Sequence, residues 1–189
     1  MLSSNYNEYY DYLNKTSLLG NLYRKIILYP YLYKNLKGKC LDIGCGLGNF
    51  VKFRTNTDGC DINKVAINNL KKKGLEVFLI EKDILPVKDE SYDSLLMDNV
   101  LEHIDNPQKI LFECKRVLKN DGIFLIGVPG KKGFDSEIDH KIYYHRENLE
   151  FLMLNFDFQL IKVDYKPIKF HFLNTILRQY CMYCLFKKK

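Results

Sequence analysis

The chain has 189 residues, of which 47% are hydrophobic and 28% are charged, and its formal net charge is +6. A chain of this length and composition forms one globular domain that buries its core without disulfide bonds. No apolar stretch reaches the ~18 residues that span a bilayer, and the N-terminus lacks the pattern of a signal peptide, so we expect a soluble or at most peripheral protein. The positive charge suits a phosphate-bearing substrate, nucleic acid or an anionic membrane surface, and it selects none of them.

Six cysteines are present, but their spacing argues against a metal centre. Cys181 and Cys184 form the single C-x-x-C pair, and one pair cannot complete a four-ligand zinc site. Unpaired cysteines behave as small buried hydrophobes in a reducing compartment. We therefore expect no bound metal and a cytoplasmic location.

A tyrosine-rich leader from about residue 5 to residue 36 carries apolar residues at helical spacing, and Pro30 is expected to interrupt it. We expect this leader to pack as a helical cap or to act as a mobile lid over the ligand. Alternating strands and helices follow it. The expected strands span residues 39–43, 57–62, 75–80, 92–97, 123–128, 158–164 and 167–172. The expected helices begin near residue 49, span residues 64–72, 107–118 and 147–154, and include a last helix at the end of the chain.

Strands that alternate with helices predict a parallel sheet covered by helices on both faces. In such a sheet the ligand lies beyond the carboxyl ends of the strands. The chain shows no internal repeat and no linker, so one α/β domain is expected. It divides into a helical cap at residues 1–36, a Rossmann-like core at residues 37–173 and a C-terminal helix at residues 174–189.

A glycine-rich turn follows the first expected strand, within the sequence Cys-Leu-Asp-Ile-Gly-Cys-Gly-Leu-Gly-Asn of residues 40–49. Gly44, Gly46 and Gly48 let a ligand approach the backbone where a side chain would collide with it. Asp42 at the strand end can accept a hydrogen bond from a ligand ammonium group. The alternation G-x-G-x-G differs from the G-x-G-x-x-G of dinucleotide sites and lacks the Gly-Lys-Ser/Thr of phosphate loops. A nicotinamide-dependent dehydrogenase is therefore disfavoured.

Two further carboxylates follow the second and third expected strands. Asp61 can accept hydrogen bonds from both ribose hydroxyls of a nucleoside, and it can equally cap the helix that begins near Asn63. Asp83 can accept from an adenine amino group while Ile84 packs against the ring. Together with the glycine turn, these residues match an amino acid, a ribose and an adenine.

These residues, continued by Tyr92-Asp93 and by the segment from Leu101 to Ile104, resemble the class I S-adenosylmethionine-dependent methyltransferases. The similarity covers roughly residues 38–165 and looks closest to the small-molecule branch with the ubiquinone/menaquinone-type and sugar-modifying enzymes. It implies S-adenosylmethionine as cofactor, S-adenosylhomocysteine as product, and a Rossmann-like, doubly wound, seven-stranded sheet that is mostly parallel with an antiparallel last strand. It also implies a cofactor site formed by Asp42, Gly44, Cys45, Gly46, Gly48, Asp61, Ile62, Asp83, Ile84, Asp98 and Asn99.

Three side chains are candidates for catalytic work on the acceptor. His103 follows the fourth expected strand, where it can act as a base or fix the loop by a hydrogen bond to backbone. The resemblance implies that His140 and Tyr144 face the substrate pocket. We expect His140 to be the general base or to orient the substrate, since methyl transfer from a sulfonium needs mainly alignment of the nucleophile and removal of its proton. The alternative for the neighbouring segment from His145 to Asn148 is that it forms only a helix start.

Several acceptor classes are disfavoured by the residues after the fourth and fifth expected strands. Enzymes that methylate adenine or glutamine amino groups carry an Asn/Asp-Pro-Pro-aromatic tetrapeptide where this chain has Met97 to Val100. Metal-dependent catechol-type enzymes need carboxylates after both strands, and residues 127–130 offer none. The dispersed lysines form no basic platform with interleaved aromatic residues, so nucleic acid is not expected as a partner.

The tail from residue 174 to residue 189 mixes apolar and aromatic residues with a terminal lysine cluster. We expect a helix that packs on the sheet or forms a dimer contact, or alternatively a peripheral membrane helix on anionic lipid. The predicted protein is an S-adenosylmethionine-dependent methyltransferase, monomeric or homodimeric, that methylates an oxygen of a sugar, a lipid-linked glycan or a quinone-like molecule. The alternative is a non-catalytic S-adenosylmethionine-binding or scaffold protein that retains the fold.

Overall fold

The computed structural model describes residues 17–189, so the expectations for residues 1–16 of the helical cap lie outside the described residues. Seven strands form one sheet in the order β3-β2-β1-β4-β5-β7-β6. The strands are β1 (Cys40–Ile43), β2 (Thr57–Asp61), β3 (Val77–Leu79), β4 (Tyr92–Asp98), β5 (Leu118–Pro129), β6 (Phe158–Lys166) and β7 (Cys181–Lys188). The helical elements are α2 (Leu18–Tyr23), η1 (Arg24–Leu28), α3 (Tyr29–Asn35), α4 (Asn49–Phe53), α5 (Lys64–Lys72), η2 (Leu101–His103), α6 (Gln108–Val117), α7 (Lys131–Asp135), α8 (Arg146–Leu154) and η3 (His171–Thr175).

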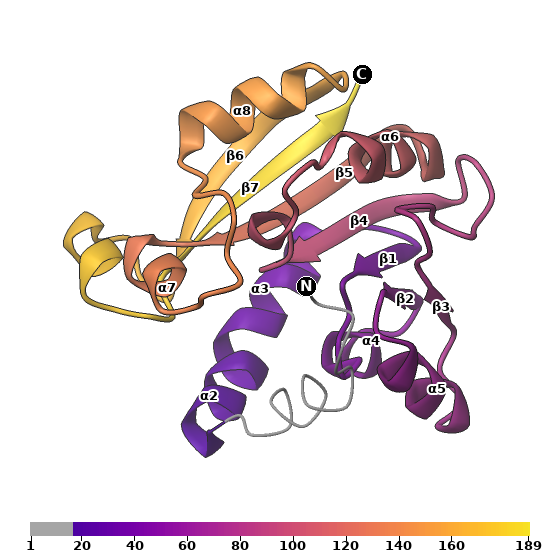
Figure 1. Ribbon diagram of the computed structural model, residues 1–189, viewed down its shortest axis with the longest axis horizontal. Coiled ribbons are helices and arrows are strands. Elements are labelled where there is room, and N and C mark those ends of the chain that lie inside the picture. Colours follow the sequence, from indigo (N-terminus) through magenta and orange to yellow (C-terminus); the bar gives the residue numbers. More distant parts are fainter. Residues whose placement is uncertain (1–16) are drawn as a thin grey trace.

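Strand pairing confirms the predicted sheet. β1 pairs in parallel with β2 and β4 at the centre, and β3 and β5 continue the parallel arrangement outward. β7 runs antiparallel between β5 and β6. Helices cover both faces (Figure 1), with α6 and α8 on one side and α3 on the other. The doubly wound α/β architecture therefore places the carboxyl ends of five parallel strands, β1 to β5, at one edge of the sheet.

The central strand β4 shows how the core is filled. Leu95 and Met97 pack in one cluster with Ile110 and Leu111 of α6, whereas Leu96 packs in the other cluster with η1 and α3. Successive side chains of a strand point to opposite faces. Since both faces of β4 are covered, its apolar run is continuous instead of alternating. The central strand that ends at the carboxyl edge of the sheet is therefore buried on both faces.

The C-terminal tail differs from the prediction, because residues 181–188 form β7 and not a helix. β7 lies between β5 and β6, which supply hydrogen-bond partners along both of its edges. Its residues from Cys181 to Cys184 are all buried, on both faces of the sheet. A short apolar run suits a buried helix and a buried strand equally well, and the two neighbouring strands decide between them.

Three further expectations for the C-terminal part of the chain are wrong as well. The strand expected at residues 167–172 is absent, since β6 ends at Lys166 and the chain then passes into η3. The division into a core at residues 37–173 and a C-terminal helix at residues 174–189 is wrong, because β7 belongs to the core sheet. The peripheral membrane helix is wrong as well. In the described part of the chain, no helix has the length and apolar character needed to cross a bilayer.

The helical cap continues through Pro30, contrary to the expected interruption. Pro30 is the second residue of α3, and the turn before it widens into the π-helix η1, where the Tyr29 N–H donates to the Arg24 carbonyl. Proline has no N–H to donate and clashes with the preceding turn of a regular helix. A locally wider turn accommodates it. The cap therefore reaches the sheet as a continuous helical segment from residue 18 to residue 35.

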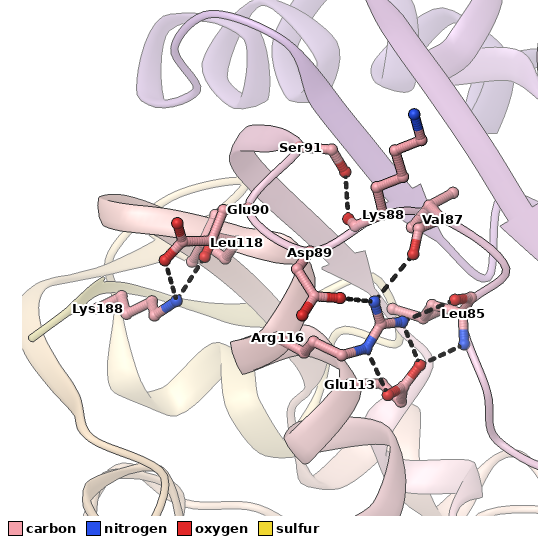
Figure 2. A network of polar contacts seen from close by, with 10 residues as sticks. All are labelled: Leu85, Val87, Lys88, Asp89, Glu90, Ser91, Glu113, Arg116, Leu118 and Lys188. Carbon is pink, nitrogen blue, oxygen red and sulfur yellow. Dashed lines mark hydrogen bonds and ion pairs between the residues drawn. The ribbon is translucent and has the colours of Figure 1, made fainter.

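A polar network around Arg116 of α6 holds the segment between β3 and β4 in place (Figure 2). The guanidinium donates to the carbonyls of Leu85 and Val87 at 2.8 and 2.9 Å. It also binds the carboxylates of Asp89 and Glu113, each with a contact of 2.6 Å. Glu113 in turn accepts from the Leu85 N–H at 2.9 Å. A planar guanidinium with five donors suits this bridging role, and the network fixes the chain that leaves the carboxyl end of β3.

Candidate active site

The glycine-rich turn joins β1 to α4 at the carboxyl edge of the sheet. Gly44, Gly46 and Gly48 have φ angles of 77°, 51° and 65°, a range that residues with a Cβ atom rarely adopt. A Cβ atom on Gly44 would lie 2.4 Å from Val100 Cγ2. The Gly44 N–H donates to the Cys60 carbonyl at 2.7 Å. The turn is therefore held against β2 in a conformation that requires glycine.

Gly44→Ala should destabilise the protein by about 2–4 kcal/mol, because the added Cβ combines left-handed backbone strain with overpacking against Val100. Gly74→Ala is the matched control, since Gly74 has a φ of +75° and nothing within 4 Å of the added Cβ. The control should lose only about 1–2 kcal/mol. Urea unfolding followed by circular dichroism measures both losses, and equal losses would contradict the close contact at Gly44.

The six cysteines are free and buried. Cys45 lies in the glycine turn, but a Cβ on Gly59 would lie 2.8 Å from its sulfur, so its side chain packs beneath the turn. Cys45 can therefore offer a ligand only its backbone. Cys181 and Cys184 are three residues apart on β7, which places their side chains on opposite faces of the sheet. They cannot chelate one ion.

Three carboxylates converge where β1, β2 and β4 end, and Asp42 is the most isolated of them. Asp42 is 5% exposed, and within residues 17–189 no hydrogen bond or ion pair stabilises its charge. Burial raises the pKa of Asp42 well above its usual range, and the carboxylates of Asp98 and Asp61 raise it further. An uncompensated carboxylate at this place favours a cationic ligand.

Asp61 ties the end of β2 to the glycine turn. Its two carboxylate oxygens accept from the N–H groups of Gly46 and Asn63, each at 2.8 Å. Burial raises the pKa of Asp61, and these backbone hydrogen bonds oppose the rise. The helix-capping alternative is wrong, because Asn63 itself caps α5 by accepting from the N–H groups of Val65 and Ala66.

Asp98 is held by its neighbour Asn99 and by groups from two distant parts of the chain. It accepts from the Tyr183 hydroxyl at 2.8 Å and from the Asn99 side chain at 2.9 Å. Burial raises the pKa of Asp98, and the Arg24 guanidinium of the helical cap opposes the rise most strongly. A Cβ on Gly127 would lie 2.4 Å from the Tyr183 ring, so this packing also needs glycine. Sequence reasoning missed Arg24, because helical spacing does not reveal which strand end a helix contacts.

Asp83 and Ile84 follow β3 in an exposed tight turn. Lys82 and Asp83 have positive φ angles, and the Ile84 N–H donates to the Glu81 carbonyl at 3.0 Å. Ile84 is 56% exposed, and Ile62, which follows the neighbouring strand β2, is 50% exposed. The two isoleucines thus offer apolar surface after adjacent strand ends.

A second cluster lies beyond β4 and brings the two candidate histidines together. The ring centroids of His103 and His140 are 4.6 Å apart. His140 Nδ1 lies 2.8 Å from the Phe134 carbonyl oxygen; since a carbonyl only accepts, Nδ1 carries the proton in the neutral imidazole and Nε2 then has the lone pair. His103 hydrogen-bonds to the backbone of Asp139. Burial, together with the neighbouring His140, lowers the pKa of His103.

Glu102 completes this cluster, and sequence reasoning did not predict it. Its side chain is fully buried, and neither carboxylate oxygen has a hydrogen-bond partner in the described structure. His140 Nε2 lies 3.8 Å from Glu102 Oε1. Burial raises the pKa of Glu102 to about 8, with a smaller contribution from Asp98. The signal in the sequence was an acidic residue inside the mostly apolar run from Val100 to Ile104.

Tyr144 borders the same cluster. It is 5% exposed, and its hydroxyl has no partner among the residues described. Burial raises the pKa of Tyr144 to about 12, and Glu102 contributes to the rise. A hollow of about 280 Å³ lies beside it, where β5 ends and β7 begins; its lining includes Pro129, Gly130, Tyr143, Tyr144, Tyr180 and Met182. His145 caps α8, which confirms the helix-start interpretation of that residue.

Residues 41–126 match a family described as "Methyltransferase domain". An uncharacterized protein of Methanocaldococcus jannaschii is 40% identical over 98 residues, which cover 52% of this chain and 48% of that protein. The tRNA (carboxymethyluridine(34)-5-O)-methyltransferase of Arabidopsis thaliana is 33% identical over 103 residues, which cover 52% of this chain and 26% of that enzyme. A solved S-adenosylmethionine-dependent methyltransferase from Archaeoglobus fulgidus has a TM-score of 0.70 at 20% identity and covers 95% of this chain and 100% of that one. This is the class I methyltransferase fold.

The methyltransferase fold explains why the two clusters share one edge of the sheet, since both follow the carboxyl ends of strands. The segment that matches the family contains the glycine turn and the carboxylates of Asp61 and Asp98, whereas His140 and Tyr144 come after it. The chain spans about half the length of the first relatives it matches, 48% and 50% of two proteins from Methanocaldococcus jannaschii.

Proposed function

We propose that this chain binds S-adenosylmethionine at the carboxyl ends of β1, β2 and β4 and transfers its methyl group to an acceptor. The observation that carries the proposal is the buried carboxylate of Asp42, which no described cation pairs with and which lies near the carboxylates of Asp61 and Asp98. Arg24 offsets part of this charge beside Asp98. S-adenosylmethionine carries an ammonium and a sulfonium. These two cationic groups would offset the negative charge of the Asp42, Asp61 and Asp98 carboxylates.

The amino-acid end of the cofactor fits the glycine turn. Asp42 accepts from the ammonium group, and the turn at residues 44–48 admits the methionine portion against its backbone. Asp98 and Asn99 close this part of the site from the end of β4. Asp61 accepts from the ribose hydroxyls through the lone pairs that its two backbone hydrogen bonds leave free.

The adenine end fits the exposed residues after β2 and β3. Ile62 and Ile84 are about half exposed in the ligand-free chain, at 50% and 56%. Burying such apolar surface against a ring stabilises the complex by roughly 25 cal/mol per Å². Asp83, in the same turn as Ile84, accepts from the adenine amino group.

The cluster of Glu102, His103 and His140 serves the acceptor. When bound, S-adenosylmethionine supplies an activated methyl group on its sulfonium, so the chain must align the acceptor and remove its proton. His140 Nε2 carries a lone pair for this proton. The lowered pKa of His103 keeps its imidazole neutral near pH 7. The Tyr144 hydroxyl, which lacks a partner in the described chain, is placed to orient the acceptor.

We propose that the acceptor is a small molecule methylated on oxygen, such as a sugar, a lipid-linked glycan or a quinone-like ring. The hollow of about 280 Å³ suits a group of one ring, and its tyrosines offer faces for stacking. The likeness to a tRNA methyltransferase favours a nucleoside in RNA as the second candidate. A non-catalytic S-adenosylmethionine-binding protein is the remaining alternative.

Binding and transfer can be measured separately. S-adenosylhomocysteine should bind in isothermal titration calorimetry and raise the melting temperature. The tritiated methyl group of S-adenosylmethionine should enter the small-molecule or lipid fraction of a cell extract; label in RNA would establish the second candidate instead. Binding without transfer to any fraction would support the non-catalytic alternative, and absence of binding would refute the proposed function.

His140→Gln should slow single-turnover methyl transfer by about 10²–10⁴-fold, the usual contribution of a general base. The substitution keeps a side chain of similar size and should leave S-adenosylhomocysteine affinity unchanged, because His140 lies in the acceptor cluster and not beside Asp42. Rapid-quench measurement with the extract-derived acceptor provides the rate. An unaltered rate would remove His140 from the proposed role.

A further inference from the structure

Glu102, His103 and His140 have the composition and spacing of a metal-ligand set. One carboxylate oxygen and one nitrogen from each ring all lie within 4.8 Å of one another. Glu102 is fully buried, and both of its oxygens lack a hydrogen-bond partner among residues 17–189. Burying an unpaired carboxylate is costly, so its persistence at this place calls for a partner that the described residues do not supply. We propose that these three residues bind a divalent transition-metal ion.

The His140 imidazole is oriented in the way that a metal-binding histidine requires. His140 donates from Nδ1 to the Phe134 carbonyl at 2.8 Å, which leaves Nε2 free to bind an ion. Its ring also stacks on the Phe134 ring, with centroids 5.2 Å apart. His103 hydrogen-bonds to the backbone of Asp139. A histidine ligand commonly donates its other N–H to a carbonyl, which fixes the tautomer and the ring orientation.

The three ligand atoms lie within 4.8 Å of one another and must move closer together to enclose an ion. Metal–ligand bonds of about 2.0–2.2 Å place neighbouring ligand atoms roughly 3.0–3.5 Å apart. Glu102 Oε1 and His140 Nε2 are 3.8 Å apart. Rotation of the Glu102 carboxylate can supply this difference without a change in the backbone.

Two imidazoles and one carboxylate favour an ion such as Zn²⁺ or Co²⁺ over Mg²⁺ and Ca²⁺, which prefer oxygen ligands. Three protein ligands leave at least one coordination position open. Tyr144 lines the hollow and is coupled electrostatically to Glu102, so an acceptor hydroxyl beside Tyr144 would reach that position and become more acidic there; with the ion bound, this acidification replaces proton removal by the His140 Nε2 lone pair. This consequence rests on the proposed methyl transfer, whereas ion binding does not. The sequence-based expectation of no metal rested on the cysteine spacing and on the carboxylate pattern of catechol-type enzymes, and it did not include Glu102.

Cobalt titration of the chelator-treated full chain tests the proposal. Co²⁺ should bind one ion per chain with visible d–d absorption and without a thiolate charge-transfer band. Zn²⁺ should displace it, and a large excess of Mg²⁺ should not. Glu102→Gln and His140→Gln should each weaken Co²⁺ binding by about 100-fold or more, since even outer-shell changes cost about 10–100-fold. His145→Gln, an exposed histidine outside the cluster, should bind Co²⁺ as the wild type does.

Three results would overturn the proposal: no stoichiometric Co²⁺ binding, a thiolate band that assigns the ion to cysteine, or equal weakening in the His145→Gln control. S-adenosylhomocysteine binding is measured on the same samples with chelator present. Intact S-adenosylhomocysteine binding without Co²⁺ binding refutes the metal site alone, and Co²⁺ binding without S-adenosylhomocysteine binding refutes the proposed function alone. Intact S-adenosylhomocysteine binding in Glu102→Gln also shows that this variant is folded.

Discussion

Asp42→Asn should weaken S-adenosylhomocysteine binding by about 10- to 100-fold, because the variant loses a charged hydrogen bond to the ligand ammonium worth roughly 1.5–3 kcal/mol. The same substitution should stabilise the ligand-free protein, since the folded chain no longer buries this carboxylate near those of Asp61 and Asp98. Calorimetry measures the affinity, and urea unfolding measures the free energy of unfolding. Asp105→Asn, which changes an exposed carboxylate, is the control and should alter neither.

The stability gain of Asp42→Asn should depend on pH in a defined direction. The pKa of Asp42 is higher in the folded protein than its ordinary value of 3.8, so the folded state keeps a proton that the unfolded chain has released. The stabilising contribution of this proton is fully present below the unfolded pKa and is lost as the pH rises through the folded pKa. Wild-type stability should therefore fall more steeply than that of the variant as the pH rises from the ordinary value of 3.8 through the raised pKa of the folded protein. Parallel pH profiles, or wild-type affinity in the variant, would contradict the role of Asp42.

Phe186→Ala should cost about 3–5 kcal/mol of stability, the usual loss for a buried phenylalanine in a core. Phe186 is fully buried in β7 and packs in the cluster that holds Phe124 and Phe158. The neighbouring Lys187 points to the other face and is exposed, so Lys187→Ala is the matched control, with an expected loss below about 1 kcal/mol. Urea unfolding of the full chain measures both. Small and similar losses would contradict a core strand at this position and restore the tail as a peripheral element.

The cofactor end of the site was accessible to sequence reasoning because it depends on short, local patterns. Gly44, Gly46 and Gly48 require positive φ angles that glycine adopts readily. Asp42 is the last residue but one of β1, and Asp61 is the last residue of β2. The carboxyl ends of parallel strands meet at one edge, so placing each strand also placed its carboxylate. The structure adds that Asp61 accepts from the Gly46 N–H, a contact between two segments that no single pattern contains.

The acceptor end was accessible only in part. The resemblance implied roles for His140 and Tyr144, and the structure places His140 against His103. Glu102 was missed because a glutamate is ordinarily exposed, and only the folded chain shows that this one is buried without a partner among residues 17–189. The contact between Arg24 and Asp98 was missed for a similar reason, since their attraction requires the cap to lie over the end of β4.

The sequence by itself determined the parallel core, the glycine turn and the carboxylates that follow the strands, because hydrophobic period and glycine conformation are local properties of the chain. Only the tertiary structure decided that the tail is β7. The apolar run beginning at Cys181 buries its side chains in a helix or in a strand alike. The unpaired backbone groups of β5 and β6 select the strand, since buried N–H and C=O groups must find partners.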